Sequence, residues 1–89
     1  MSEPVRVIYL GKLADIAGRS GTRLDVHAGP IDWSYLIDIL ENKVVPGLGE
    51  AVSDDRVMVA LNGTLLADKT ALVAQEGDEI AFLPPVSGG

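Results

Sequence analysis

The order of apolar and polar residues along this chain predicts several short β-strands. Runs rich in β-branched and aromatic residues are typical of strands, and strict alternation of apolar and polar positions is typical of a half-buried strand. Asn62-Gly63, between two such runs, is a strong signal for a tight hairpin turn. Strands are therefore expected over residues 5–10, 22–27, 56–61, 64–66 and 79–83.

One longer segment carries apolar residues at helical spacings of three and four. These residues are Trp33, Leu36, Ile37, Leu40 and Val44. Asp32 precedes them as a favourable N-cap, and Pro46-Gly47 follows them as a stop signal. The pattern predicts an amphipathic helix over residues 33–44. Two shorter helical segments are expected over residues 12–17 and 48–52.

This order of elements predicts a small α+β domain. The first two strands are expected to pair as an open hairpin. One main helix can cover only one face of a four- or five-stranded sheet, so the expected architecture is a β-grasp roll with a mixed sheet. Residues 1–83 are expected to form this domain and residues 84–89 an extended tail, because Pro84-Pro85 cannot continue the last strand.

Strand parity predicts which apolar side chains the helix leaves uncovered. Leu10 points to the opposite face from Tyr9, as Leu83 does from Phe82. The helix can bury only one of these two faces. We therefore expect an exposed apolar patch of Leu10, Leu65 and Leu83 beside the tail, and we expect it to bind a partner.

The composition restricts the class of protein and its partners. Eighty-nine residues, of which 47% are hydrophobic, suffice for one small globular domain. Thirteen acidic and seven basic residues give a formal net charge of −6. Nucleic acids and anionic membrane surfaces are therefore not expected partners, whereas a basic protein surface would be attracted. No apolar run is long enough to span a membrane.

Conventional catalytic and metal-binding side chains are scarce. The chain has no cysteine and a single histidine, His27, so thiolate sites and clusters of histidine ligands are not expected. The adjacent carboxylates Asp54-Asp55 and Asp78-Glu79 lie in predicted turns, where we expect them to be solvated. No bound cofactor or metal is expected. The lack of cysteine and of a recognisable secretory signal favours a cytoplasmic location.

The last six residues are the most distinctive segment: Pro84, Pro85, Val86, Ser87, Gly88 and Gly89. Two prolines directly after a strand favour a stiff, extended chain over a flexible coil. Two glycines carry no side chain that would obstruct a narrow channel. This arrangement predicts a tail that presents the α-carboxylate of Gly89 to the active site of a partner.

A ββαβββ domain that ends in Gly-Gly resembles the ubiquitin-like proteins. The segment from Gly77 to Gly89, GDEIAFLPPVSGG, resembles more closely the small sulfur-carrier subunits of molybdopterin synthase. The similarity extends more loosely through residues 7–18, Asp32 with the helix after it, and Asn62-Gly63-Thr64-Leu65. On these residues the chain is identified as a member of the ubiquitin-like sulfur carriers.

The resemblance implies a non-catalytic subunit that acts as a cosubstrate of its partners. In such a scheme an E1-like adenylating enzyme, which binds ATP, joins AMP to the Gly89 carboxylate. A persulfide-bearing sulfurtransferase then replaces AMP with sulfur to give a thiocarboxylate. Residues 84–88 enter a channel in the large catalytic subunit, within a hetero-oligomer expected to be a heterotetramer. There the sulfur passes to a cyclic pterin precursor during molybdenum cofactor biosynthesis.

Three alternatives share the main features of the sequence. A sulfur carrier for another pathway, such as thiamine or cysteine synthesis, has the same fold and the same Gly-Gly end. A protein modifier would join Gly89 to a lysine by an isopeptide bond. A plain binding module would carry an inert tail. Pro84-Pro85-Val86 favours the molybdopterin version.

Overall fold

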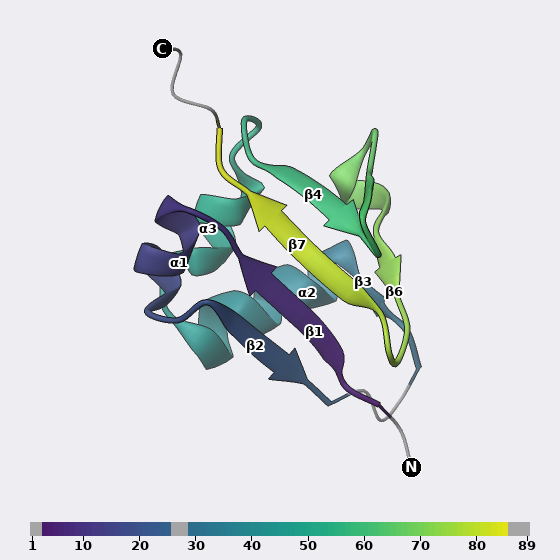
Figure 1. The fold of residues 1–89 in the computed structure, drawn as a ribbon. Helices are drawn as coiled ribbons and strands as arrows, with labels where there is room; N and C mark the ends of the chain where they lie inside the picture. The colour runs from purple at the N-terminus through teal and green to yellow at the C-terminus, as the bar shows by residue number, and fades with distance from the viewer. Residues whose placement is uncertain (1–2, 26–28, 86–89) are drawn as a thin grey trace.

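A five-stranded mixed sheet is the centre of the computed structural model, which describes residues 3–25 and 29–85 (Figure 1). Its strands are β1 (Val5–Tyr9), β2 (Gly21–Leu24), β4 (Met58–Leu61), β5 (Thr64–Leu65) and β7 (Glu79–Leu83). They follow the order β2-β1-β7-β4-β5, in which β1 and β7 are parallel and the other neighbours are antiparallel. The first and last strands of the domain therefore meet in the middle of the sheet.

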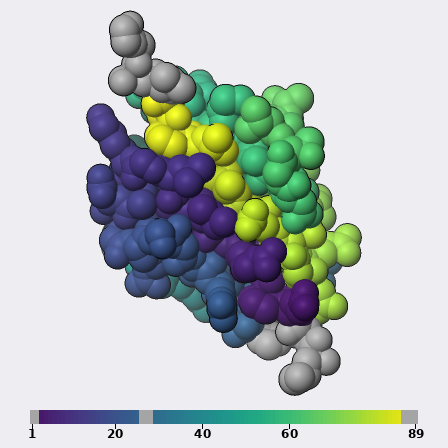
Figure 2. Space-filling model, in the orientation of Figure 1, coloured from purple at the N-terminus to yellow at the C-terminus, as the bar shows by residue number. Residues whose placement is uncertain are grey.

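The helices lie on one side of this sheet, behind it in the view of Figure 1. They are α1 (Lys12–Ala17), α2 (Trp33–Ile39), which continues as a π-helical segment over Leu40–Val44, and α3 (Leu48–Ser53). A two-stranded sheet of β3 (Ile31–Asp32) and β6 (Val73–Ala74), with a 3₁₀ helix over Lys69–Ala71, completes the described fold. Figure 2 shows the opposite face, where the strands of the main sheet form the surface.

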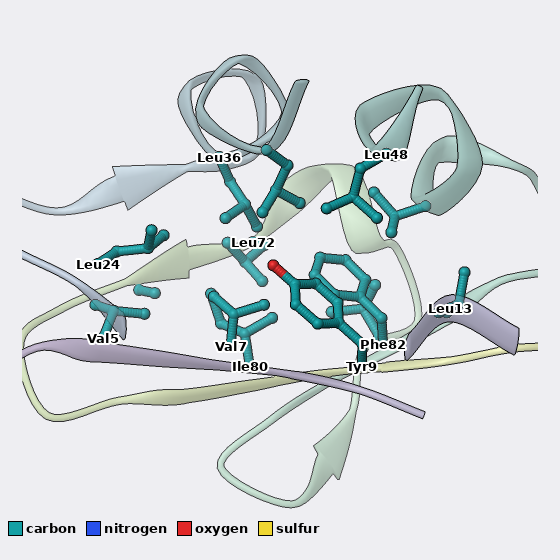
Figure 3. Close-up of a cluster of buried hydrophobic side chains, with 14 of the residues drawn as sticks. Val5, Val7, Tyr9, Leu13, Leu24, Leu36, Leu48, Leu72, Ile80 and Phe82 are labelled. Atoms are coloured by element: carbon teal, nitrogen blue, oxygen red, sulfur yellow. The ribbon is translucent and has the colours of Figure 1, made fainter. Parts of the chain in front are cut away.

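The core lies between the sheet and the helices, with two aromatic rings near its centre (Figure 3). Tyr9 of β1 and Phe82 of β7 pair in register, and their rings stack with centroids 6.2 Å apart and an interplanar angle of 8°. The Tyr9 hydroxyl donates a hydrogen bond to Thr22 Oγ1 over 3.0 Å, and burial raises the pKa of Tyr9. The largest buried aliphatic residues around the rings are Ile31, Leu36, Leu40, Leu48, Leu72 and Ile80.

Two carboxylates determine how the helices begin. Asp32 accepts a hydrogen bond from the Tyr35 N–H over 2.8 Å, which confirms it as the N-cap of α2. Glu41, in the π-helical segment, accepts from the Gly47 N–H at 2.7 Å and the Gly49 N–H at 3.1 Å. Glu41 therefore satisfies two N–H groups at the start of α3. This contact fixes α3 against the main helix.

Lys69 stabilises the chain that leads from α3 into β4. Its ammonium group donates hydrogen bonds to the carbonyls of Val52, Asp54 and Val57. The same group lies 5.8 Å from the centroid of the Trp33 ring, within the range of a cation–π interaction. Partial burial lowers the pKa of Lys69. The Lys69 ammonium group thus binds three backbone carbonyls that converge on it.

The predicted Asn62-Gly63 turn forms and is tied to the turn that precedes β7. Asn62 adopts a positive φ of 50°, and its side-chain amide donates to Asp78 Oδ1 at 3.0 Å and accepts from the Glu79 N–H at 2.9 Å. Asp78 also accepts from the Gln75 N–H at 2.8 Å. The Asp78 carboxylate is therefore a structural group that joins two turns, and not a freely solvated one.

The predicted fold class is confirmed, and the ends of several elements differ from the prediction. The strand expected over residues 56–61 begins at Met58, because Asp54 binds the Arg56 N–H and holds the preceding residues in a turn. The first strand ends at Tyr9 and the short fourth one at Leu65. The strand expected over residues 22–27 spans Gly21–Leu24, while positions 26–28 lie outside the described residues.

Removal of the Phe82 ring should severely destabilise the domain. We expect Phe82→Ala to lower the free energy of unfolding by about 3–5 kcal/mol, because the variant loses a buried ring and leaves a cavity beside Tyr9. Met58→Ala is the matched control, since the Met58 side chain is 48% exposed on the other face of the sheet. It should cost at most about 0.5 kcal/mol. Urea unfolding measures both, and equal losses would contradict the assignment of faces.

Acid should destabilise the fold through three aspartates. Hydrogen bonds from the Arg56 side chain and backbone lower the pKa of Asp54 to about 2, and those from Thr70 lower the pKa of Asp68. The Gln75 N–H, and then the Asn62 side chain, lower the pKa of Asp78. Unfolded aspartates titrate near pH ~3.9, so this stabilisation is present above that pH and is lost as the pH falls through the folded-state pKa values.

Urea unfolding at a series of pH values from about 5 to about 2 measures this loss, because it covers the interval between the unfolded and folded pKa values. The Asp78→Asn variant keeps an acceptor for the Gln75 N–H but cannot ionise. Its free energy of unfolding should therefore change less steeply over the same interval. A profile as steep as that of the unaltered protein would show that Asp78 does not contribute.

Candidate functional site

The tail leaves the domain at the end of β7, and we call its first two residues, Pro84 and Pro85, the tail root. Pro84 is half-buried and Pro85 is exposed. The Leu10 N–H donates to the Phe82 carbonyl over 3.1 Å, which keeps the end of β1 beside the end of β7. The predicted tail residues Val86, Ser87, Gly88 and Gly89 lie outside the described residues.

Gly11 makes room for the tail root. It has a φ of 55°, and a Cβ atom at this position would lie 2.9 Å from Cγ of the Pro84 ring. Such a separation is too short for two carbon atoms, and a positive φ is unfavourable for residues with a side chain. The Pro84 ring can therefore pack over the backbone of the β1–α1 turn. This contact defines the direction in which the tail begins.

A cleft opens next to the tail root, between α1, α3 and the approach to β4. Pro84 and Pro85 form part of its wall. Its other apolar lining comes from Leu13, Ile16, Ala51 and Val57, and its charged lining comes from Lys12, Glu50, Asp54 and Arg56. Arg56 is engaged there, because its Nε lies 3.1 Å from Asp54 Oδ1. This cleft could not be predicted from the sequence, since its walls come from segments far apart in the chain.

The uncovered face of the sheet carries apolar side chains near the tail root. Leu10 is 42% exposed and Leu65 is 51% exposed, whereas Leu83 is half-buried. Met58, at 48% exposure, lies directly opposite Leu83 in the β4–β7 register. We call Leu10, Met58, Leu65 and Leu83 the sheet patch.

The sequence reasoning missed Met58, although strand parity alone places it on the same face as Ala60, the register partner of Leu65. That the sheet patch binds a partner stays a prediction.

Two of the four carboxylates that the sequence singled out, Asp54 and Asp78, are engaged within the fold. Asp54 binds Arg56, and Asp78 binds Asn62 and the Gln75 backbone. Within residues 3–25 and 29–85, no three His, Cys, Asp or Glu side chains come together in a way that could hold a metal ion. His27 lies outside the described residues. No helix in the described part of the chain is long and apolar enough to cross a membrane.

A mixed sheet with its first and last strands parallel in the middle, packed on a main helix, defines the ubiquitin-like β-grasp class. The chain belongs to the ThiS family, whose model matches residues 7–89.

Similar proteins extend over nearly the whole chain. A molybdopterin synthase sulfur carrier subunit from Anopheles gambiae is 33% identical over 88 residues, which cover 96% of this chain and 91% of that protein. The crystal structure of small archaeal modifier protein 1 from H. volcanii matches with a TM-score of 0.69 and 28% identity, over 94% of this chain and 99% of that one.

A third match is a chain from the complex of subunits 1 and 2 of molybdopterin-converting factor from Helicobacter pylori. It has a TM-score of 0.62 and 30% identity, over 97% of this chain and 99% of that one. In the Helicobacter pylori complex, a chain similar to this one assembles with a second subunit.

Substitution within the sheet patch should separate binding from folding. We expect Leu10→Asp to change the free energy of unfolding by no more than about 0.5 kcal/mol, because the residue is exposed and lies outside the buried core. Binding to a partner that covers the sheet patch should weaken, since a carboxylate would enter an apolar contact without a partner. Thermal melts and titration calorimetry measure the two effects. If Leu10→Asp unfolds the domain, the patch belongs to the core and the prediction is wrong.

Proposed function

We propose that this protein is the sulfur carrier subunit of molybdopterin synthase and that it acts through the α-carboxylate of Gly89. The observation that carries the proposal is the similarity over nearly the full length to the Anopheles gambiae subunit of that name. The Helicobacter pylori complex supports a second subunit as the partner. The family match, which extends to residue 89, supports a role for the tail.

The first step that we propose is activation of the Gly89 carboxylate. A carboxylate is a poor acyl donor because oxide is a poor leaving group. In the active site of an E1-like adenylating enzyme, a carboxylate oxygen attacks the α-phosphorus of ATP and pyrophosphate leaves. The product is an acyl-adenylate, in which AMP is a good leaving group. ATP is bound by the partner, and this chain supplies only the carboxylate.

The second step introduces sulfur. The terminal sulfur of a persulfide on a sulfurtransferase attacks the Gly89 carbonyl carbon, and AMP leaves with the bonding electron pair. The resulting acyl disulfide is cleaved by a thiol, which is oxidised to a disulfide with the sulfurtransferase cysteine. Gly89 is released as a thiocarboxylate. The absence of cysteine from this chain is compatible with these steps, since the sulfur is carried on the terminus.

The third step delivers the sulfur. The tail, residues 84–89, enters a channel in the large catalytic subunit, and the thiocarboxylate sulfur attacks a carbon of the cyclic pterin precursor that carries an oxygen substituent. The carbon–sulfur bond forms as the carbon–oxygen bond breaks, and the oxygen leaves with the bonding electron pair. Water then cleaves the acyl–sulfur bond, so that the sulfur stays on the pterin and Gly89 returns to a carboxylate. Two deliveries build the dithiolene that holds molybdenum. We propose a cytoplasmic heterotetramer of two large and two small subunits for this step.

The described geometry suits a carrier that is handled by several partners. The close contact of Gly11 with Pro84 gives the tail a defined starting direction. The sheet patch lies at the same end of the sheet and offers an apolar surface that a partner can bind. A partner that binds the patch therefore receives the tail from a fixed position, which reduces the entropy lost when the carboxylate is placed in its active site.

Deletion of Gly88 and Gly89 should abolish loading without unfolding the domain. The melting temperature should remain unchanged within error, because terminal residues contribute little to the stability of a domain. ATP-dependent attachment of AMP by the cognate adenylating enzyme should be lost, since the deletion removes the reactive carboxylate from its position. Intact-mass spectrometry of the reaction measures the attachment. Full adenylation of the truncated chain would refute the proposal.

Two milder changes test whether the position and the width of the tail matter. One residue added after Gly89 displaces the carboxylate by about 3.3–3.6 Å and should also impair loading. Gly88→Val should impair it through β-branched bulk in a narrow channel. Mass analysis of protein from its source distinguishes the alternatives: sulfur in place of oxygen indicates a carrier, and an isopeptide conjugate indicates a modifier. A free acid that no adenylating enzyme accepts indicates an inert tail.

A further inference from the structure

Two arginines face each other on the uncovered side of the sheet. Arg6 of β1 is the register partner of Arg23 of β2, and both side chains are exposed. In the same ladder the Tyr9 N–H donates to the Ser20 carbonyl, so Tyr9–Ser20 is a hydrogen-bonded pair. Because such pairs alternate along antiparallel strands, Arg6–Arg23 is a non-hydrogen-bonded pair, in which side chains approach most closely. We call these two residues the arginine pair.

The described part of the chain does not bind either member of the arginine pair in an ion pair with a carboxylate. Glu79 of β7 is the neighbour of Arg6 on the other side, so at most one of the two positive charges has an acidic residue in register with it. By contrast, Arg56 is bound to Asp54, and Lys69 is bound to three carbonyls.

Like charges directly opposite each other destabilise an antiparallel pair of strands. Folding alone therefore gives no reason for this arrangement, and a substitution at either position would remove the repulsion between the two charges. A negatively charged group on another molecule would offset this repulsion as well. The guanidinium group is suited to this role, because its planar donors bind carboxylates in a bidentate manner.

The arginine pair also lies in line with the sheet patch. Arg6 and Ile8 alternate along β1, and Leu10, which directly follows the strand and still pairs with β7, continues the alternation on the same face of the sheet. At about 3.3 Å per residue, Arg6 lies about 13 Å from Leu10 along the strand. Apolar residues near the tail root thus pass into a pair of positive charges farther from it, as in protein interfaces with an apolar centre and a charged rim.

We propose that the arginine pair is a docking site for two carboxylates on the partner that covers the sheet patch. Taking the large subunit as that partner rests on the function proposed above. The net charge of −6 acts on this contact mainly through nearby acidic residues such as Glu79, the register neighbour of Arg6, because charges farther away than about 8 Å are largely screened at physiological ionic strength. It does disfavour a polyanion such as nucleic acid, whose phosphates would extend over the rest of the acidic surface.

Arg23→Glu tests the proposal, because it changes stability and binding in opposite directions. The melting temperature should stay the same or rise, since a carboxylate opposite Arg6 replaces like charges with an ion pair. The dissociation constant for the large subunit should increase about tenfold at about 0.1 M salt, mainly through slower association. The difference should largely vanish at about 1 M salt, where the screening length falls to about 3 Å.

Lys43→Glu is the matched control. It makes the same change in net charge but lies in the π-helical segment, in the layer of helices behind the sheet. Its dissociation constant should stay within about twofold of that of the unaltered chain, because a distant charge is screened. Equal weakening by Lys43→Glu and Arg23→Glu would attribute the effect to net charge and overturn the proposal.

Arg23→Gln provides a second variant, which removes the charge without reversing it and should give an intermediate dissociation constant. Unchanged affinity for both Arg23 variants at low salt would overturn the docking site and leave the proposed function intact. If the unaltered chain itself fails to bind the large subunit, the proposed function and the docking site both fail. Surface plasmon resonance at the two salt concentrations separates these outcomes.

Discussion

Parallel pairing of β1 with β7 is the constraint on which the rest of this structure depends. It stacks Tyr9 on Phe82 and so closes the core from two segments near opposite ends of the domain. Because the two strands run in the same direction, they also end at the same edge of the sheet. The turn after β1 and the chain after β7 therefore meet, which is why Gly11 lies against Pro84. An antiparallel arrangement would send these segments to opposite ends.

The same pairing divides the chain into a structural face and a surface for partners. Along β1 and β7, alternate side chains enter the core, and those between them remain on the uncovered face. Polar side chains with a structural role lie outside these two strands: Glu41 in the π-helical segment, Asp78 in a turn and Lys69 in the 3₁₀ helix. The uncovered face thereby carries the sheet patch and the arginine pair, which lie outside the core. Such a surface is suited to a protein that functions while it is bound to a partner.

Much of this architecture could be predicted from the sequence, because a long segment with a regular apolar–polar period indicates which of its residues are buried. The main helix and the strands around Val7 and Ile80 have that property. The two-residue strands β3 and β6 do not, since two residues carry no period. The structural role of Lys69 could not be predicted either, because a single lysine in a sequence does not indicate which carbonyls will surround it in the fold. The cleft beside Pro84 and the arginine pair depend on register between strands and helices, which only the folded chain defines.

The sequence separation between β1 and β7 also has a kinetic consequence. Contacts between distant segments form late and slowly, because a long loop must close before they stabilise the chain. Helical turns and the β1–β2 hairpin can form locally, whereas the slot between β1 and β4 stays empty until β7 enters it. Pro84 reaches Gly11 only after that event. A partner that engages both the sheet and the emerging tail would thus select molecules that have finished folding and pass over incomplete ones.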